Sequence, residues 1–317
     1  MTSSISNRLQ AGSYIPTFCL FCLLATSALA APWVGDQPQP GGFPLVADRK
    51  AATIVFSPED HKVVSLVAND LAADIARVTG VKPVVAAFPS VSGPAVLVGT
   101  LGESPLINGL VDTGKLDVKE LSGAWESFLI TTVTDPLPNV PFAVVIVGSD
   151  RRGTAFGVYE LSSAIGVSPW YWWADVAPAK KSALHLAAGT RRFGPPSVQY
   201  RGIFLNDEDW GLQPWAAKTF EPETGDLGPK TYAKVCELLL RLKANTLWPG
   251  MHPSTKAFNH FPKNKQVADD YAIVMGSSHA EPMLRNNVDE WTAPKETYNY
   301  VTNRDGVRVY WEQRVKE

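Results

Sequence analysis

Cysteine is scarce in this sequence: there are three in 317 residues, and two of them, Cys19 and Cys22, fall in the first thirty. Only Cys236 remains beyond that segment, so we expect no disulfide framework and a fold stabilised by its hydrophobic core. Charge of one sign is also lacking, because 29 Lys and Arg stand against 31 Asp and Glu. So neutral a balance gives no sign of a polyanionic partner, and we expect no nucleic acid ligand.

Two familiar binding motifs are incomplete. The turn at 148–154 has neither G-x-G-x-x-G spacing nor a Gly-Lys-Ser/Thr ending, so we interpret it as a strand-to-helix turn capped by Asp150 or Thr154 rather than a phosphate loop. The string at 279–281 resembles the His-x-Glu half of a zinc deaminase site, but the Pro-Cys-x-x-Cys half is absent. We therefore predict no metal. A different metal, held by histidines and carboxylates, is the minor alternative.

The first thirty residues have the pattern of a secretory signal peptide. Arg8 gives a weakly positive start, residues 15–24 are apolar, and Ala28-Leu29-Ala30 has the small-x-small form of a cleavage site. A retained membrane anchor is the minor alternative, because the apolar run is short for a span and a Pro- and Gly-rich linker follows. We predict a secreted, extracellular protein without membrane contact once the signal is removed.

Strand and helix patterns alternate through the predicted N-terminal domain, residues 31–190. Strands are predicted at 53–57, 83–88, 95–99, 127–132 and 142–148, and helices at 61–79 and 154–165. Such alternation predicts an α/β domain with helices covering a sheet. The aromatic run at 170–173 is either a sugar platform or a packed seam between domains. We favour the seam, because amphipathic aromatic side chains also fill interfaces.

From 191 to 317 the order of strand, polar loop and helix repeats three times. Strands are predicted at 200–205, 245–248 and 272–275, and helices at 229–242, 267–271 and 306–315. This order is typical of a (β/α) barrel, whose chemistry lies in the loops after the strands. A complete barrel needs eight such units, so we expect this chain to be the first part of a longer barrel protein.

Polar side chains gather directly after these strands. The first strand runs into Asn206, Asp207, Glu208, Asp209 and Trp210. Successive carboxylates repel one another, and partial burial raises the pKa of at least one, which suits proton transfer or polyol binding. A solvated turn is the alternative interpretation.

The loops after the other two strands carry histidines, His252 after the second and His279 after the third. A single histidine is more often structural than catalytic. Two at equivalent loop positions, beside a carboxylate cluster, favour a functional site.

Five segments in order, 148–154, 166–176, 200–211, 247–253 and 276–283, together resemble glycoside hydrolase family 115. The resemblance implies a hexosaminidase-like N-terminal α/β domain followed by the first three βα units of a catalytic (β/α)8 barrel. It also implies an inverting xylan α-1,2-glucuronidase that releases (4-O-methyl-)glucuronic acid from glucuronoxylan without a cofactor. A homodimer of the full-length protein stays an open alternative.

An inverting glycosidase needs an acid and a base carboxylate about 6.5–9.5 Å apart, with a water between them. With the resemblance in view, we assign the catalytic role to Asp207 and Glu281 and expect further carboxylates on later strands. The expected substrate-binding residues are Asn206, Glu208, Asp209, Trp210, His252, His279 and Arg285. Two other functions stay open: another exo-glycosidase of hexosaminidase-like layout, and an inactive carbohydrate-binding fragment.

Overall fold

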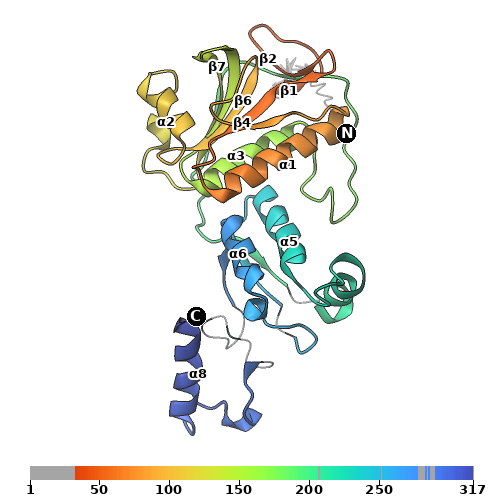
Figure 1. Ribbon diagram of the computed structural model, residues 1–317, viewed down its shortest axis with the longest axis vertical. Coiled ribbons are helices and arrows are strands. Elements are labelled where there is room, and N and C mark those ends of the chain that lie inside the picture. Colours follow the sequence, from red (N-terminus) through yellow and green to blue (C-terminus); the bar gives the residue numbers. More distant parts are fainter. Residues whose placement is uncertain are drawn as a thin grey trace, which may run out of the picture. The chain divides into compact units, whose positions relative to one another are not determined.

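A computed structural model describes residues 33–205, 208–250, 252–277, 283, 285 and 290–316, with only the backbone of Glu208 (Figure 1). The predicted signal peptide lies outside the described residues.

The larger sheet has six strands in the order β10-β7-β8-β6-β4-β5. They are β4 (Thr53–Phe56), β5 (Val85–Ala87), β6 (Ala95–Thr100), β7 (Phe128–Leu137), β8 (Val140–Gly148) and β10 (Thr190–Phe193). Strands β5, β4, β6 and β8 run parallel, and β7 and β10 are antiparallel. All six residues of β6 are buried, as expected for a central parallel strand covered on both faces.

Helices α1 (Lys62–Thr79) and α3 (Arg151–Ala164) lie side by side on one face of this sheet, and α2 (Pro105–Asp112) lies on the other (Figure 1). Successive side chains of a strand point to opposite faces. Accordingly Ile54 and Val96 join the core with α1 and α3, whereas Val55 and Leu97 join the core with α2. The sheet therefore separates two apolar layers, which confirms the predicted α/β arrangement.

A second, antiparallel sheet has the strand order β1-β9-β2-β3. Its strands are β1 (Val34–Gly35), β2 (Phe43–Ala47), β3 (Lys50–Ala51) and β9 (Leu184–Leu186). The inward residues of β2 and β9 join the core under α1 and α3. Part of the stretch that we expected to be a linker is therefore strand β2.

The five predicted strands and two predicted helices of this region are confirmed, with shifted ends, whereas α2 and strands β2, β9 and β10 were missed. Ser104 was the available signal for α2, because its side chain caps Ile107 N and Pro105 follows at the first helical position. The predicted Asp150 cap is confirmed: its carboxylate accepts from Arg152 N at 3.0 Å and Gly153 N at 2.8 Å.

The C-terminal part has three parallel strands in the order β11-β12-β13. The strands are β11 (Gly202–Phe204), β12 (Thr246–Trp248) and β13 (Val274–Met275), and the helices after them are α5 (Pro229–Arg241), α6 (Pro262–Asp270) and α8 (Arg304–Lys316). The three strand–helix units that the sequence predicts are confirmed. No closed barrel forms among the described residues. Between β11 and α5 the chain is helical from Glu208 to Phe220, through α4 (Gln213–Trp215) flanked by two π-helical turns, where we expected a loop.

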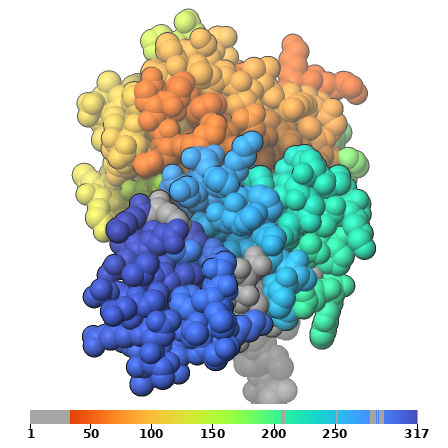
Figure 2. Space-filling view, turned by 60° about the horizontal axis from the view of Figure 1, so that its bottom comes forward, coloured from red at the N-terminus to blue at the C-terminus, as the bar shows by residue number. Residues whose placement is uncertain are grey.

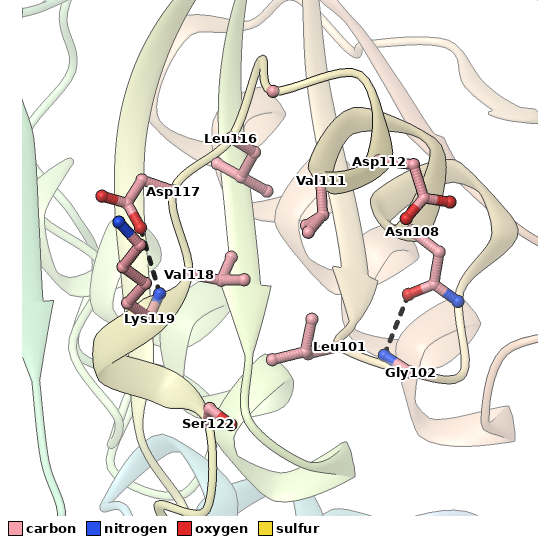
Figure 3. Close-up of a pocket in the computed structure, with 11 residues that line it drawn as sticks. Leu101, Gly102, Asn108, Val111, Asp112, Leu116, Asp117, Val118, Lys119 and Ser122 are labelled. Atoms are coloured by element: carbon pink, nitrogen blue, oxygen red, sulfur yellow. Dashed lines mark hydrogen bonds between the residues drawn. The ribbon is translucent and has the colours of Figure 1, made fainter.

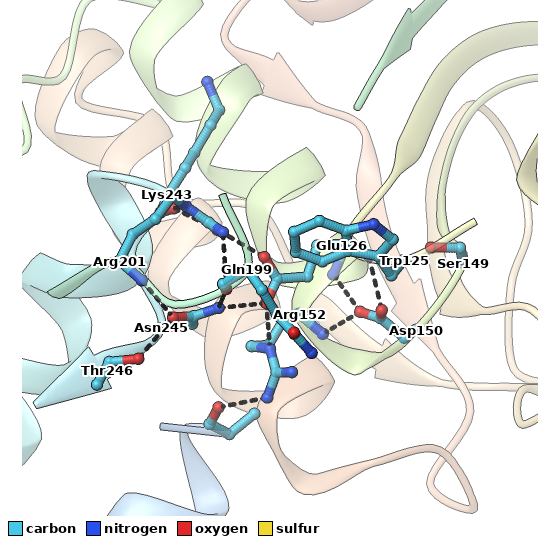
Figure 4. Close-up of polar contacts among 12 residues, drawn as sticks. Trp125, Glu126, Ser149, Asp150, Arg152, Gln199, Arg201, Lys243, Asn245 and Thr246 are labelled. Atoms are coloured by element: carbon cyan, nitrogen blue, oxygen red, sulfur yellow. Dashed lines mark hydrogen bonds and ion pairs between the residues drawn. The ribbon is translucent and has the colours of Figure 1, made fainter. Parts of the chain in front are cut away.

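One buried carboxylate ties the starts of the three parallel strands to the larger sheet (Figure 4). Glu126, in the loop before β7, accepts from Arg201 Nη2 at 2.6 Å and from Asn245 Nδ2 at 2.6 Å. Arg201 directly precedes β11 and Asn245 directly precedes β12. Arg152 donates its Nε to the same carboxylate at 2.5 Å and its Nη1 to the carbonyl of Ala272, just before β13. The strands thus begin at fixed heights, which also fixes the loops at their opposite ends.

A second buried network joins α1 to α5. The carboxylate of Asp74 accepts from Arg241 Nη1 at 2.7 Å and Nη2 at 3.2 Å. Arg241 Nε and the hydroxyl of Tyr171 both donate to Glu237 Oε1, at 2.9 and 2.8 Å. Figure 2 shows the teal segment that holds α5 lying directly against the N-terminal layers. Trp173 Nε1 also donates to the carbonyl of Lys234 in α5 at 3.2 Å, so the aromatic run forms the packed seam that we favoured.

Candidate functional site

The carboxyl ends of β11, β12 and β13 meet at one edge of their sheet. Just past β11, Leu205 N donates to the carbonyl of Trp248 at 3.0 Å, and just past β13, Gly276 N donates to the carbonyl of Leu247 at 2.9 Å. The loops after the three strands therefore leave the sheet beside one another. In parallel α/β sheets and barrels, this edge is where ligands bind.

Asp209 and His252 lie in contact at this edge. His252 Nδ1 is 2.6 Å from Asp209 Oδ2, and the hydroxyl of Ser254 donates to Asp209 Oδ1. The loops after β11 and β12 are thus joined by one carboxylate. Asp209 and His252 were predicted from the sequence, whereas Ser254 was missed. The signal for Ser254 was its place in the same polar loop, two residues after His252.

The hydrogen bonds at Asp209 determine how its group is protonated. Ser254, first, and His252, second, hold the pKa of Asp209 below its usual value by hydrogen bonding. An ionised carboxylate only accepts hydrogen bonds, so the proton in the contact belongs to His252 Nδ1. A neutral histidine with a proton on Nδ1 has a lone pair on Nε2, and a protonated one carries a second N–H there. Such a ring suits either a sugar hydroxyl or an anionic carboxylate.

Aromatic side chains flank the same edge. Trp210 is 91% exposed and Trp248 is 42% exposed. Phe204 packs edge-on against Trp248, with 5.9 Å between the ring centroids. A Cβ at Gly276 would lie only 2.3 Å from Trp248 Nε1, so glycine is required where β13 ends for the indole to hold this position. The edge thus combines indole surface with charged groups, a combination that suits a sugar ligand.

Arg285 is buried against the last helix. Its Nη2 donates to the carbonyl of Tyr310 at 2.9 Å, its guanidinium lies over the Tyr310 ring at 4.3 Å, and its Nη1 is 3.6 Å from Glu290 Oε2. The guanidinium therefore contributes to the packing of α8.

Four predicted site residues lie outside the described residues: Asn206, Asp207, His279 and Glu281. Of Glu208 only the backbone is described, as the first residue of the helical segment. The structure thus places Asp209, Trp210 and His252 at the strand ends, and the two catalytic assignments stay predictions.

Within the described ranges, no cluster of three or more His, Cys, Asp or Glu side chains is placed to hold a metal ion. In the same ranges, no helix has the length and apolar character needed to cross a bilayer.

A separate pocket of about 780 Å³ lies between α2 and the loop that follows it (Figure 3). Leu101, Val111, Leu116 and Val118 form its apolar walls. Its polar side chains include Asn108, which accepts from Gly102 N at 3.0 Å, and Asp117, which accepts from Lys119 N at 3.1 Å. These hydrogen bonds satisfy the pocket's own loops, so they identify no ligand.

Comparison with known proteins agrees with this geometry. Residues 193–317 match the family profile described as Glycosyl hydrolase family 115. No match was found among curated proteins. Among solved structures, a family GH115 4-O-methyl-α-glucuronidase with specificity for decorated arabinogalactans is 38% identical, with a TM-score of 0.74. That match covers 90% of this chain and 34% of the other, so this chain spans about a third of its relative.

Two β-hexosaminidases are more distantly similar. A mutant enzyme from Streptomyces plicatus is 15% identical with a TM-score of 0.44, and the GH20 enzyme from Streptomyces coelicolor A3(2) is 14% identical with a TM-score of 0.41. Each match covers 76% of this chain and 44% of the other. Similarity at this level adds nothing to the assignment, which depends on the 38% match and the family profile. With its α/β layers followed by three parallel strand–helix units, the chain belongs to glycosyl hydrolase family 115.

Proposed function

We propose that this chain is part of a secreted glycoside hydrolase that releases (4-O-methyl-)glucuronic acid from the side chains of glucuronoxylan, with inversion at the anomeric carbon. The observation that carries the proposal is the contact of Asp209 with His252 and Ser254 at the carboxyl ends of β11 and β12. It supplies charged and hydrogen-bonding groups where a family 115 chain carries the polar residues of its strand ends.

We assign the uronate carboxylate to His252 and His279. A charge-assisted hydrogen bond from an imidazolium is about twice as strong as a neutral one, which favours histidine at an anionic sugar. Arg285 was the other cationic candidate, but its guanidinium is engaged with Tyr310 and Glu290. Trp210 and Asn206 would contact the sugar face and its hydroxyls.

We assign acid and base catalysis to Asp207 and Glu281, which follow different strands of the same sheet. Successive side chains of one turn diverge, so two carboxylates on separate loops suit the separation of about 6.5–9.5 Å that inversion requires. The three parallel strands would be the first three of a (β/α)8 barrel, whose later strands would complete the site.

The test uses the protein extended to the length of its family relative. Incubation with glucuronoxylan should release (4-O-methyl-)glucuronic acid that appears first as the β-anomer in time-resolved ¹H NMR. Initial appearance of the α-anomer would contradict inversion. Release of uronate only from decorated arabinogalactan would replace the substrate and keep the reaction. Cleavage of β-N-acetylhexosaminides instead of glucuronosides would favour the alternative exo-glycosidase.

A further inference from the structure

An aromatic pocket of about 580 Å³ lies beside the helical segment that carries Asp209. Its wall is formed by two stretches of chain that are distant in sequence, the seam at the end of the N-terminal layers and the segment after β11. The residues used below are Tyr171, Trp172, Trp173, Asp175, Gly211 and Trp215.

The rings of this pocket are held in place from behind. The hydroxyl of Tyr171 is bonded to Glu237 and Trp173 Nε1 to the carbonyl of Lys234, so α5 anchors both side chains. Trp172 meets Trp215 nearly edge-on, with 5.7 Å between ring centroids and 72° between ring planes. Because the rings are fixed before any ligand arrives, binding would cost little side-chain entropy.

The lining combines aromatic surface with a carboxylate. Trp172, Trp173 and Trp215 are each partly exposed, and Asp175 is exposed. The C–H face of a pyranose ring packs on indole surface, while a carboxylate accepts hydrogen bonds from its hydroxyl groups. We propose that this pocket binds a neutral pyranose unit of the polysaccharide main chain, an inference that rests on the proposed function.

The charge of the lining selects a neutral sugar. Asp175 places a negative charge in the wall, which repels a uronate. The nearest cation, Lys234, has its Nζ over the Trp172 ring at 5.4 Å and paired with Glu237 Oε2 at 2.8 Å, so its charge is already compensated. The uronate side chain would therefore bind at the strand ends, and the uncharged main chain in this pocket.

Gly211 makes the pocket continuous with the candidate site and also makes it testable. It lies two residues after Asp209 in the same helical segment and lines the pocket. A Cβ at Gly211 meets no described atom within 4 Å, so a side chain can be added without a clash. Gly211→Gln would fill the pocket while leaving the aromatic rings in place. Gly109→Gln, at a glycine of α2 with equally open surroundings, is the matched control.

The 317-residue chain is titrated with xylohexaose, and in parallel with β-1,6-galactohexaose, while the indole N–H signals are followed by ¹H–¹⁵N NMR. We expect saturable shifts for at least one oligosaccharide, with a dissociation constant of roughly millimolar order. Gly211→Gln should weaken binding about tenfold or more, a loss of about 1.4 kcal/mol, whereas Gly109→Gln should not change it. Which oligosaccharide binds distinguishes a xylan from a galactan main chain.

Absence of saturable shifts with both oligosaccharides would overturn the proposal, and so would equal binding by wild type and Gly211→Gln. Glucuronic acid shifting the same indole signals at the same concentration would overturn the selection for a neutral sugar. None of these outcomes depends on catalysis. Failure of uronate release by the longer protein, with oligosaccharide binding intact, would remove the proposed function and leave a glycan-binding pocket.

Discussion

Glu126 and Arg201 form a buried ion pair, Oε2 to Nη2 at 2.6 Å, that joins the loop before β7 to the residue directly before β11. The Glu126 side chain is 1% exposed and also holds Arg152 and Asn245. Its backbone is in the left-handed region at φ +47°, a conformation that costs a residue with a Cβ about 1–2 kcal/mol. That strain is offset because the carboxylate satisfies three donors at once.

Glu126→Gln keeps the shape of this side chain but leaves two arginines without their counter-charge. Removing one partner of a buried ion pair costs about 3–5 kcal/mol, so the free energy of unfolding should fall by that order. Chemical denaturation would measure it. Glu120→Gln is the control, since Glu120 pairs with Arg192 on the surface and should lose less than about 1 kcal/mol. Equal losses in the two variants would mean that Glu126 holds nothing essential.

Asp70→Asn should remove a pH dependence of stability. Burial, and next the nearby Glu237 carboxylate, raise the pKa of Asp70 from 3.8 to about 6. The folded protein then binds the proton more tightly than the unfolded chain, so this group lowers stability progressively as pH rises from about 4 to 6. Tyr159 donates to Asp70 Oδ2 at 2.5 Å, and the carbonyl of Asn can accept the same bond.

The measurement is the difference in unfolding free energy between wild type and Asp70→Asn at pH 4 and pH 7. The variant should gain stability relative to wild type on going to pH 7, by on the order of 2–3 kcal/mol for a shift of roughly two pKa units. A difference that does not change with pH would show that Asp70 titrates alike in the folded and unfolded states.

Ser254→Ala should raise the pKa of Asp209 toward its ordinary value, because the hydroxyl of Ser254 is the main cause of its low pKa. Titration of the ¹³C carboxylate signal by NMR would measure the shift in the 317-residue chain. Ser122→Ala, at an exposed serine of the N-terminal part, controls for general effects. An Asp209 pKa that stays where it is in wild type would show that His252 alone stabilises the carboxylate.

Asp207→Asn, in the protein extended to the length of its relative, should lower kcat on glucuronoxylan by roughly 10² to 10⁴, since it removes the titratable group and keeps its size. Substrate binding should survive, so KM should change little. Asp117→Asn, in the pocket beside α2, is the matched control and should leave kcat unaltered. A wild-type kcat for folded Asp207→Asn would move the catalytic role to Glu281 or to a later carboxylate.

The sequence by itself determined the elements whose signals are local. Apolar periodicity located the central strands and helices α1, α3 and α5, and Asp150 announced its cap through its place before the helix. The polar residues after three apolar strands predicted an edge where Asp209 and His252 meet, because parallel strands end on the same side. Order along the chain sufficed for these.

Only the tertiary structure decided which buried charges compensate one another. Asp74 interrupts the apolar face of α1, a visible signal, but its partner Arg241 lies 167 residues away. Glu126 looked like part of a turn before a strand, yet it holds the starts of three strands that come later in the chain. Such a partner is chosen by geometry and by the cost of burying an unpaired charge, and neither is written in local sequence. The same holds for the aromatic pocket, whose two walls become neighbours only when the chain folds.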